Sequence, residues 1–210
     1  MTEPAADPTD EPRVILGDRY VAALELTVSL HAHQARKGNR LPYVAHLLAV
    51  SSLVLEHGGD EDQAIAALLH DAPEDQGGEA TLARIRDEFG DRVAGIVAAC
   101  SDTFESPKPP WRARKERYIA ALDGKGPDVW PVTLADKVHN ARTIVADLRA
   151  DGPATLDRFN GGRDGTLWYY RALVDAFRAS SPPIPPIPSG LEAELERTVA
   201  ELERLATTSR

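Results

Sequence analysis

The feature that most constrains this chain is an abrupt change of polarity within one segment. An unbroken apolar run at 64–69, AIAALL, is followed at once by the polar sequence HDAPED at 70–75. The apolar run predicts a buried helix, and an imidazole with carboxylates at its end is costly to desolvate unless a partner compensates these groups. A divalent metal is the natural partner because His and Asp side chains both coordinate metals. We therefore expect the chain to fold around a metal site.

The composition favours an all-α fold. Apolar residues make up 42% and charged residues 27% of the 210 residues, as in globular proteins that bury a sizeable core. Ala and Leu dominate the apolar segments, which favours helices over strands. Helical patterns with short polar breaks follow one another along the chain, without an alternating strand pattern or an internal repeat. We expect a compact multi-helix bundle with the metal site between core helices.

Charge and cysteine content exclude several classes of partner and site. The net charge of −9 disfavours nucleic acid and anionic membranes as partners, although a small anionic ligand can still bind in a locally basic cleft. Cys100 is the only cysteine, which excludes an intramolecular disulfide and a cysteine zinc cluster. No signal peptide is recognisable, and no apolar run approaches the roughly 20 residues of a membrane helix. We expect a cytoplasmic location.

The chain divides into four predicted segments. Residues 1–16 are acidic and proline-rich and predict a disordered tail, and residues 17–180 form the main domain. Residues 181–189 predict an extended proline-rich linker, and residues 190–207 an amphipathic helix. We expect this last helix to pack back on the core, with a contribution to a homodimer as the alternative. Its apolar face comprises Leu191, Leu195, Val199, Leu202 and Leu205.

Two further residues of metal-ligand type lie in apolar helical segments. His46 lies within PYVAHLL, and Asp136 follows the apolar residues VTLA. Taken alone, His46 is interpreted as a hydrogen-bonded core histidine and Asp136 as a capping or ion-paired residue. Together with His70 and Asp71 they would form one site with two nitrogen and two oxygen ligands. Such a set suits Mn²⁺, Fe²⁺ or Zn²⁺ better than Ca²⁺.

The order H…HD…D resembles the HD superfamily of metal-dependent phosphohydrolases. The segments RKGNRLPYVAH at 36–46, ALLHDAPED at 67–75 and LADKVHNAR at 134–142 are similar to successive motifs of the alarmone hydrolases. That branch comprises the hydrolase domain of Rel/Spo enzymes and their small stand-alone relatives. The resemblance covers roughly residues 18–178. It implies removal of the 3′-pyrophosphate from (p)ppGpp with Mn²⁺ as the metal, and Fe²⁺ or Zn²⁺ as alternatives.

The resemblance also implies roles at the metal. Glu74 and Asp75 match an acidic pair that positions or activates the attacking water; the alternative is a solvated acidic turn or a helix cap. Because Pro73 disfavours the helical conformation at Ala72, we expect the preceding helix to end close to Asp71, with the acidic pair on a turn at the mouth of the site. The implied metal ligands are His46, His70, Asp71 and Asp136.

Other residues are implied to face the substrate, a small phosphorylated nucleotide. Arg36 and Lys37 match a basic pair near the nucleotide, although Lys and Arg also complement the dipole at a helix end. Asn140 and Arg142 match the segment that follows the last metal ligand. A second basic run at 108–117 is interpreted mainly as a solvated helix face.

Two other functions stay open. The chain could hydrolyse another nucleotide, such as a nucleoside monophosphate, a nucleoside triphosphate or NADPH. It could also be a non-catalytic nucleotide-sensing HD module. The Glu-Asp pair shortly after the HD dipeptide favours alarmone hydrolysis over the first alternative, and the retention of all four ligand residues disfavours the second.

Overall fold

The computed structural model contains ten α-helices and one 3₁₀-helix in the part of the chain that it describes. Within this part there is no β-strand, only an isolated antiparallel bridge between Ala35 and Pro42. The predicted all-α fold is therefore confirmed. The predicted tail at 1–16 and linker at 181–189 lie almost entirely outside the described residues. The described ranges are 14–38, 40–103, 107–180 and 189–207.

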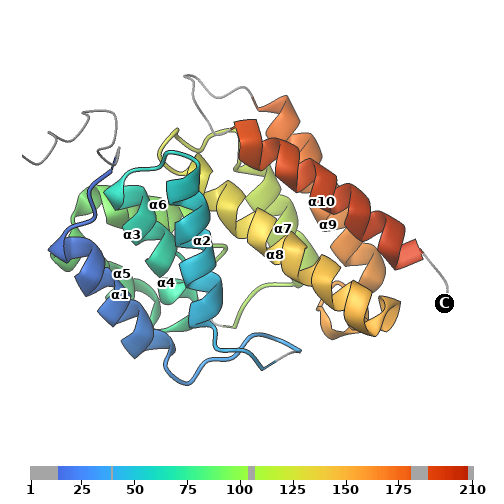
Figure 1. Ribbon diagram of the computed structural model, residues 1–210, viewed down its shortest axis with the longest axis horizontal. Helices are drawn as coiled ribbons and strands as arrows, with labels where there is room; N and C mark the ends of the chain where they lie inside the picture. The colour runs from blue at the N-terminus through green and yellow to red at the C-terminus, as the bar shows by residue number, and fades with distance from the viewer. Residues whose placement is uncertain (1–13, 39, 104–106, 181–188, 208–210) are drawn as a thin grey trace, which may run out of the picture.

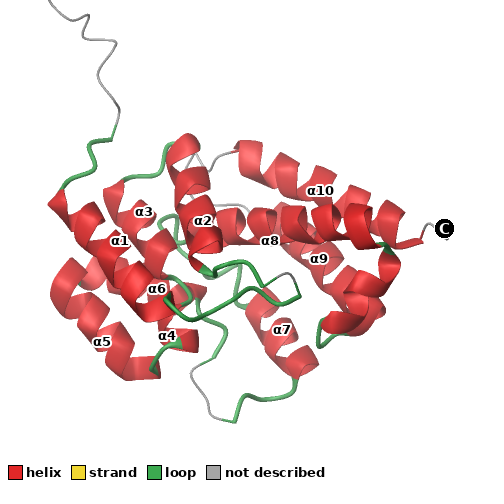
Figure 2. Cartoon of the chain, turned by 60° about the horizontal axis from the view of Figure 1, so that its bottom comes forward, coloured by secondary structure: helices red, strands yellow, loops and turns green. Residues whose placement is uncertain are grey.

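The helices form two groups that meet along the longest helix, α8 (Figure 1). The first group comprises α1 (Asp18–His31), α2 (Val44–Glu56), α3 (Glu61–Leu69), α4 (Ala72–Asp75), α5 (Gly78–Phe89) and α6 (Asp91–Cys100). The second comprises α7 (Trp111–Ala120), α8 (Trp130–Asp151), a 3₁₀-helix (Pro153–Arg158), α9 (Gly162–Ala179) and α10 (Ser189–Thr207). Helix α8 contacts α2, α3 and α6 on one side and α10 on the other. Figure 2 brings forward the face on which the long loop between α1 and α2 lies.

Helix α3 is the centre of the first group. Its residues from Gln63 to Leu69 are all buried, and it packs against α1, α2, α6 and α8. Neighbours on every side explain why the sequence here is apolar all round rather than amphipathic. The helix starts with a capping box, in which Asp60 Oδ1 accepts from Gln63 N at 3.0 Å and Gln63 Oε1 accepts from Asp60 N at 3.0 Å.

Helix α3 ends close to Asp71, as predicted, but the segment that follows it differs from the prediction. The helix ends at Leu69, because Pro73 has no N–H to donate to the Leu69 carbonyl. Ala72 is itself helical as the first residue of α4, whose first turn accommodates the proline. Glu74 and Asp75 therefore lie on a short helix rather than on a turn. His70 and Asp71 occupy the break between the two helices.

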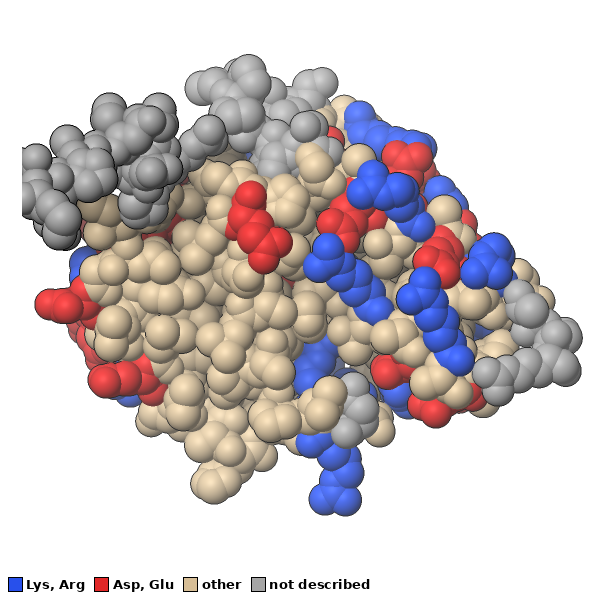
Figure 3. All heavy atoms as spheres, in the orientation of Figure 1, with Lys and Arg blue, Asp and Glu red and all other residues tan. Residues whose placement is uncertain are grey.

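Helix α10 packs back on the core, against α8 and α9. The apolar residues Leu191, Leu195, Val199 and Leu202 are buried. Arginines of α8 and α9 pair with glutamates of α10, and charged side chains gather over this part of the surface, whereas the face over α1 and α2 carries few (Figure 3). These pairs are Arg142–Glu194, Arg149–Glu201, Arg171–Glu203 and Arg178–Glu196. Among the described residues, no helix is long and apolar enough to cross a membrane.

Candidate metal centre and adjoining cavity

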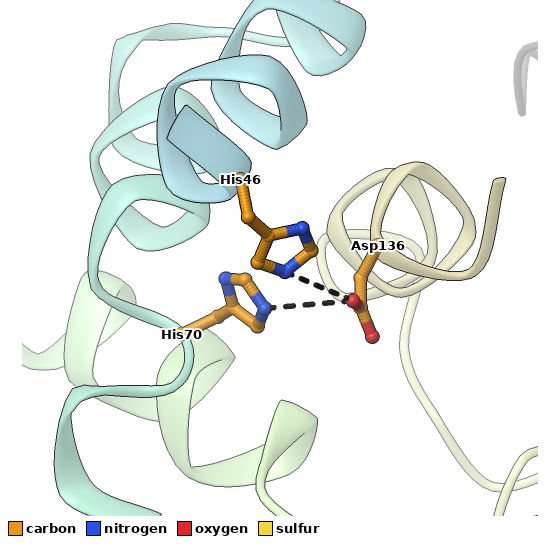
Figure 4. Close-up of side chains that lie close together, drawn as sticks. All are labelled: His46, His70 and Asp136. Carbon is orange, nitrogen blue, oxygen red and sulfur yellow. Dashed lines mark ion pairs between the residues drawn. The ribbon is translucent and has the colours of Figure 1, made fainter. Parts of the chain in front are cut away.

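Four side chains of metal-ligand type converge where three helical segments meet. His46 lies in the first turn of α2, and Asp136 lies on α8. His70 directly follows α3, and Asp71 directly precedes α4. Figure 4 shows the rings of His46 and His70 directed at the Asp136 carboxylate. The structure thus brings together all four residues that the sequence analysis singled out as ligands.

The distances suit a single ion. Asp136 Oδ1 lies 3.4 Å from His46 Nε2 and 3.7 Å from His70 Nε2. Asp71 Oδ2 lies 3.1 Å from His70 Nε2 and 3.7 Å from His46 Nε2. Metal–ligand bonds of about 2.1 Å place neighbouring ligand atoms roughly 3.0–3.4 Å apart. The separations in the cluster are close to this range.

The protonation of the rings also fits a metal. His46 Nε2 and His70 Nε2 are buried and have no hydrogen-bond partner of good geometry. His70 Nδ1 lies 2.8 Å from the carbonyl oxygen of Ala67, which can only accept, so Nδ1 carries the proton and Nε2 of the neutral ring is free to coordinate. His46 Nδ1 lies 2.8 Å from His139 Nδ1 and can donate to it in the same way. Two imidazole nitrogens and two carboxylate oxygens form a donor set for a divalent metal.

The charges within the cluster are strongly coupled. Burial alone would lower the pKa of His70, but the Asp71 and Asp136 carboxylates outweigh it and raise that pKa well above 6.5. Burial would raise the pKa of Asp136, but Lys137 and the two histidines outweigh it and hold that pKa well below 3.8. The cluster therefore attracts positive charge to the position between the rings. Protons and a metal ion compete for that position.

Neighbouring groups fix the orientation of the ligands. Tyr43 Oη donates to Asp71 Oδ2 at 2.6 Å, and Lys137 Nζ donates to Asp136 Oδ2 at 2.6 Å. Asn140 Nδ2 donates to Asp136 Oδ1. Such outer contacts orient metal ligands and tune their basicity. The sequence did not lead us to predict that Tyr43 and Lys137 hold the carboxylates, although both residues lie within the motif segments. The signal for Lys137 was a lysine inside an apolar helical segment, which needs an acidic partner.

A cavity of about 440 Å³ adjoins this cluster. Tyr43 and Asn140, which donate to the carboxylates of Asp71 and Asp136, form part of its wall, so the cavity lies directly beside the candidate metal site. The acidic pair Glu74 and Asp75 also lines it. The cationic residues in the wall are Arg36, Lys37, Lys108, Arg114, Lys115 and Arg158. This excess of cations over carboxylates favours a polyanionic ligand, in spite of the net negative charge of the chain.

The predicted substrate residues do not all reach this cavity. Arg36 and Lys37 line it, and Arg36 donates to Asn140 Oδ1 at 2.8 Å. Arg142 does not belong to the wall, because its guanidinium bonds to Glu194 of α10.

The second basic run also differs from its main interpretation as a solvated helix face. Lys108, Arg114 and Lys115 line the cavity, whereas Arg112 lies over the ring of Trp168 at 3.2 Å. Residues three or four positions apart in this run face the cavity, because they lie on the same side of α7 and of the loop before it.

The two members of the acidic pair have different surroundings. Glu74 Oε1 accepts from Lys108 Nζ at 2.8 Å, and Glu74 Oε2 accepts from Asp102 N at 3.3 Å. Desolvation in the cavity and the nearby Asp71 carboxylate raise the pKa of Asp75, although the residue stays exposed. The raised pKa makes Asp75 a better proton acceptor than an ordinary aspartate.

Comparisons with known proteins agree with this geometry. The family profile of the HD domain matches residues 23–158, which is more than half of the chain. A Synechocystis protein named probable guanosine-3′,5′-bis(diphosphate) 3′-pyrophosphohydrolase is 32% identical over 147 residues, which cover 69% of this chain but only 18% of that relative. A Xenopus tropicalis guanosine-3′,5′-bis(diphosphate) 3′-pyrophosphohydrolase is 32% identical over 125 residues, covering 58% of this chain and 67% of the relative.

A similarity to a ppGpp hydrolase is also found with a solved structure, and it extends over more of the chain. The structure of a metazoan orthologue of SpoT, which hydrolyses ppGpp, superimposes with a TM-score of 0.72 at 25% identity. The match covers 91% of this chain and 98% of that one. With its buried His–His–Asp cluster between core helices, the chain belongs to the HD-domain family and is related to the ppGpp hydrolases.

Proposed function

We propose that this protein is a metal-dependent phosphohydrolase that uses Mn²⁺ to remove the 3′-pyrophosphate from guanosine alarmones. The observation that carries the proposal is the position of a two-His, two-Asp cluster beside a cavity lined by cations and one acidic pair. The names of the Synechocystis and Xenopus relatives support the alarmone as substrate.

His46, His70, Asp71 and Asp136 would hold the metal. A bound divalent metal lowers the pKa of water from about 16 toward 7 and polarises a phosphoryl oxygen. Asp75 accepts the proton of the attacking water, which its raised pKa favours. Glu74 accepts hydrogen bonds from Lys108 Nζ and from the backbone N–H of Asp102, and it orients that water.

The cations of the wall bind the phosphate groups. Arg36 is held by Asn140 and lies over the ring of Tyr43 at 5.7 Å, so its guanidinium is pre-oriented for a phosphate oxygen. Lys37 and Lys115 add charge on the same wall. The water oxygen bonds to the phosphorus that carries the 3′ oxygen of the ribose, and the bond between that phosphorus and the 3′ oxygen breaks. The 3′ oxygen takes up a proton to become a hydroxyl, and pyrophosphate is released.

The test is a substrate panel with Mn²⁺-loaded protein: ppGpp, GTP, ATP, NADPH and nucleoside monophosphates. Release of pyrophosphate from ppGpp alone supports the proposal. Release of phosphate from another nucleotide alone would replace the alarmone as substrate, and binding of ppGpp without turnover would identify a sensing module.

A matched pair of variants connects the result to the cavity. Arg36→Ala is expected to raise KM for ppGpp, whereas Arg142→Ala, which removes a guanidinium bound to α10, is expected to leave it unchanged.

A further inference from the structure

Within the acidic pair, Asp75 is the residue whose orientation needs an explanation. It is exposed and is the last residue of the four-residue helix α4, so packing does not select its rotamer. Glu74 by contrast is fixed by Lys108. The hydrogen bond to Asp75 comes from the other side of the cavity mouth, where Gln34 Nε2 donates to Asp75 Oδ2 at 2.7 Å.

The backbone of Gln34 is fixed at both of its polar groups. Its N–H donates to the carbonyl of His31 at 3.0 Å, and its carbonyl accepts from Tyr43 N at 2.9 Å. The next residue, Ala35, forms the isolated bridge with Pro42 that joins the two ends of the loop between α1 and α2. The backbone of Gln34 is therefore held in place although the residue lies in the loop between α1 and α2.

The side-chain amide of Gln34 is fixed as well. Its Oε1 lies 2.7 Å from His31 Nδ1 and accepts from Gln76 Nε2 at 2.7 Å. His31 is 1% exposed and stacks on the ring of Tyr43 at 5.4 Å, so this anchor is itself immobile. With two groups on Oε1, the amide nitrogen must face Asp75, whose carboxylate can only accept.

From this geometry we propose that Gln34 is a positioning residue, which holds Asp75 Oδ2 so that Oδ1 faces the attacking water. The proposal rests on the hydrolase function proposed above, because it assigns a task to the proton acceptor of that reaction. The His31–Gln34–Asp75 chain starts in the buried end of α1 and ends at the mouth of the cavity. Through Tyr43, which bonds to Asp71, the same loop also supports a metal ligand.

The alternative is that Gln34 only holds the loop between α1 and α2 against α4. Two substitutions distinguish this structural role from the positioning role. Gln34→Met keeps the length and removes the donor, and Gln34→Glu replaces the donor with a second carboxylate. We expect kcat to fall about 10- to 100-fold in both, as expected for a misplaced reacting group. We expect KM and the Mn²⁺ affinity, measured by calorimetry, to change less than about twofold, because no ligand or wall cation is removed.

The decisive comparison uses the Asp75→Asn background. If Gln34 acts through Asp75, Gln34→Met adds less than about a twofold loss of kcat there, since the effects of residues that act as a unit do not add. An equal loss in both backgrounds would overturn the proposal. Gln63→Met is the matched control, because Gln63 is also a hydrogen-bonded glutamine but caps α3 away from the cavity, and its kcat is expected to stay unchanged.

A measurement without turnover keeps this inference separate from the proposed function. In NMR spectra the side-chain amide protons of Gln34 are expected downfield, and Asp75→Leu is expected to move them upfield. If wild-type protein hydrolyses no member of the panel, the proposed function fails. Unchanged amide shifts in Asp75→Leu would instead refute the Gln34–Asp75 contact.

Discussion

Asp136 faces the candidate metal position with Oδ1 and Lys137 with Oδ2, so a single substitution perturbs both contacts, and unfolding with and without metal separates the two effects. Asp136→Asn keeps the shape of the side chain and removes its charge. The metal-free variant retains a lysine whose ammonium is then without its carboxylate partner. The centre of the Tyr118 ring lies 4.7 Å from Lys137 Nζ.

The burial of the Asp136–Lys137 pair determines how much stability Asp136→Asn is expected to lose. The side chains of Asp136 and Lys137 are 11% and 12% exposed, and the Nζ–Oδ2 distance is 2.6 Å. Removing one partner of a buried pair lowers the free energy of unfolding by about 3–5 kcal/mol, because an uncompensated charge stays behind. In wild-type protein, metal at 100 times its Kd adds about 2.7 kcal/mol, which the variant is expected to lose.

Urea unfolding in EDTA and in Mn²⁺ measures both effects. The double variant Asp136→Asn with Lys137→Met is expected to recover much of the loss in EDTA, because it removes both charges, but to remain insensitive to Mn²⁺. A loss below about 1 kcal/mol for Asp136→Asn in EDTA is the value for an exposed pair and would refute the burial argument.

Three further predictions concern the acidic pair, the buried histidine and the cavity wall. Glu74→Gln is expected to lower kcat about 10- to 100-fold in a ppGpp assay while Mn²⁺ affinity is retained, since Glu74 orients the attacking water and is not a ligand. Because the folded-state pKa of His70 is raised well above 6.5, its contribution to metal-free stability is complete below that pH and is lost as pH rises through the raised value. Urea unfolding of wild type and His70→Gln over about pH 6 to 9 is expected to show this slope in the wild type only. Trp111 is part of the cavity wall, and Gly161→Ala would place a Cβ 2.6 Å from its ring, against 3.1 Å for Gly165→Ala. The KM for ppGpp is therefore expected to rise more in Gly161→Ala than in Gly165→Ala.

Local sequence was sufficient for the long helices, although not for α4, and for the four side chains proposed as metal ligands. The apolar run of α3 predicts burial whatever surrounds it, and the Asp60 capping box is encoded within four residues. His46, His70, Asp71 and Asp136 are recognisable because a ligand type in an apolar segment needs a compensating partner. These features depend on neighbours in the chain or on the cost of burial, and both can be read from residue order.

The cavity depended on the tertiary structure. Its wall combines the loop at 34–43, the acidic pair of α4, the start of α7 and the start of α9, which are far apart in sequence. Arg142 lies close to Asp136 in sequence, yet α10 supplies Glu194 and holds its guanidinium outside the wall. Gln34 lies 41 residues from Asp75 but donates to its carboxylate.

The sequence by itself therefore determined the all-α fold and identified the four side chains that form the His/Asp cluster. The tertiary structure decided which cations line the cavity and which side chain donates to Asp75. The physical reason is that burial and helix formation act along the chain, whereas pairing between exposed polar groups depends on which helices pack together. Lys108 and Arg112 illustrate this, since one lines the cavity beside Glu74 and the other stacks on Trp168.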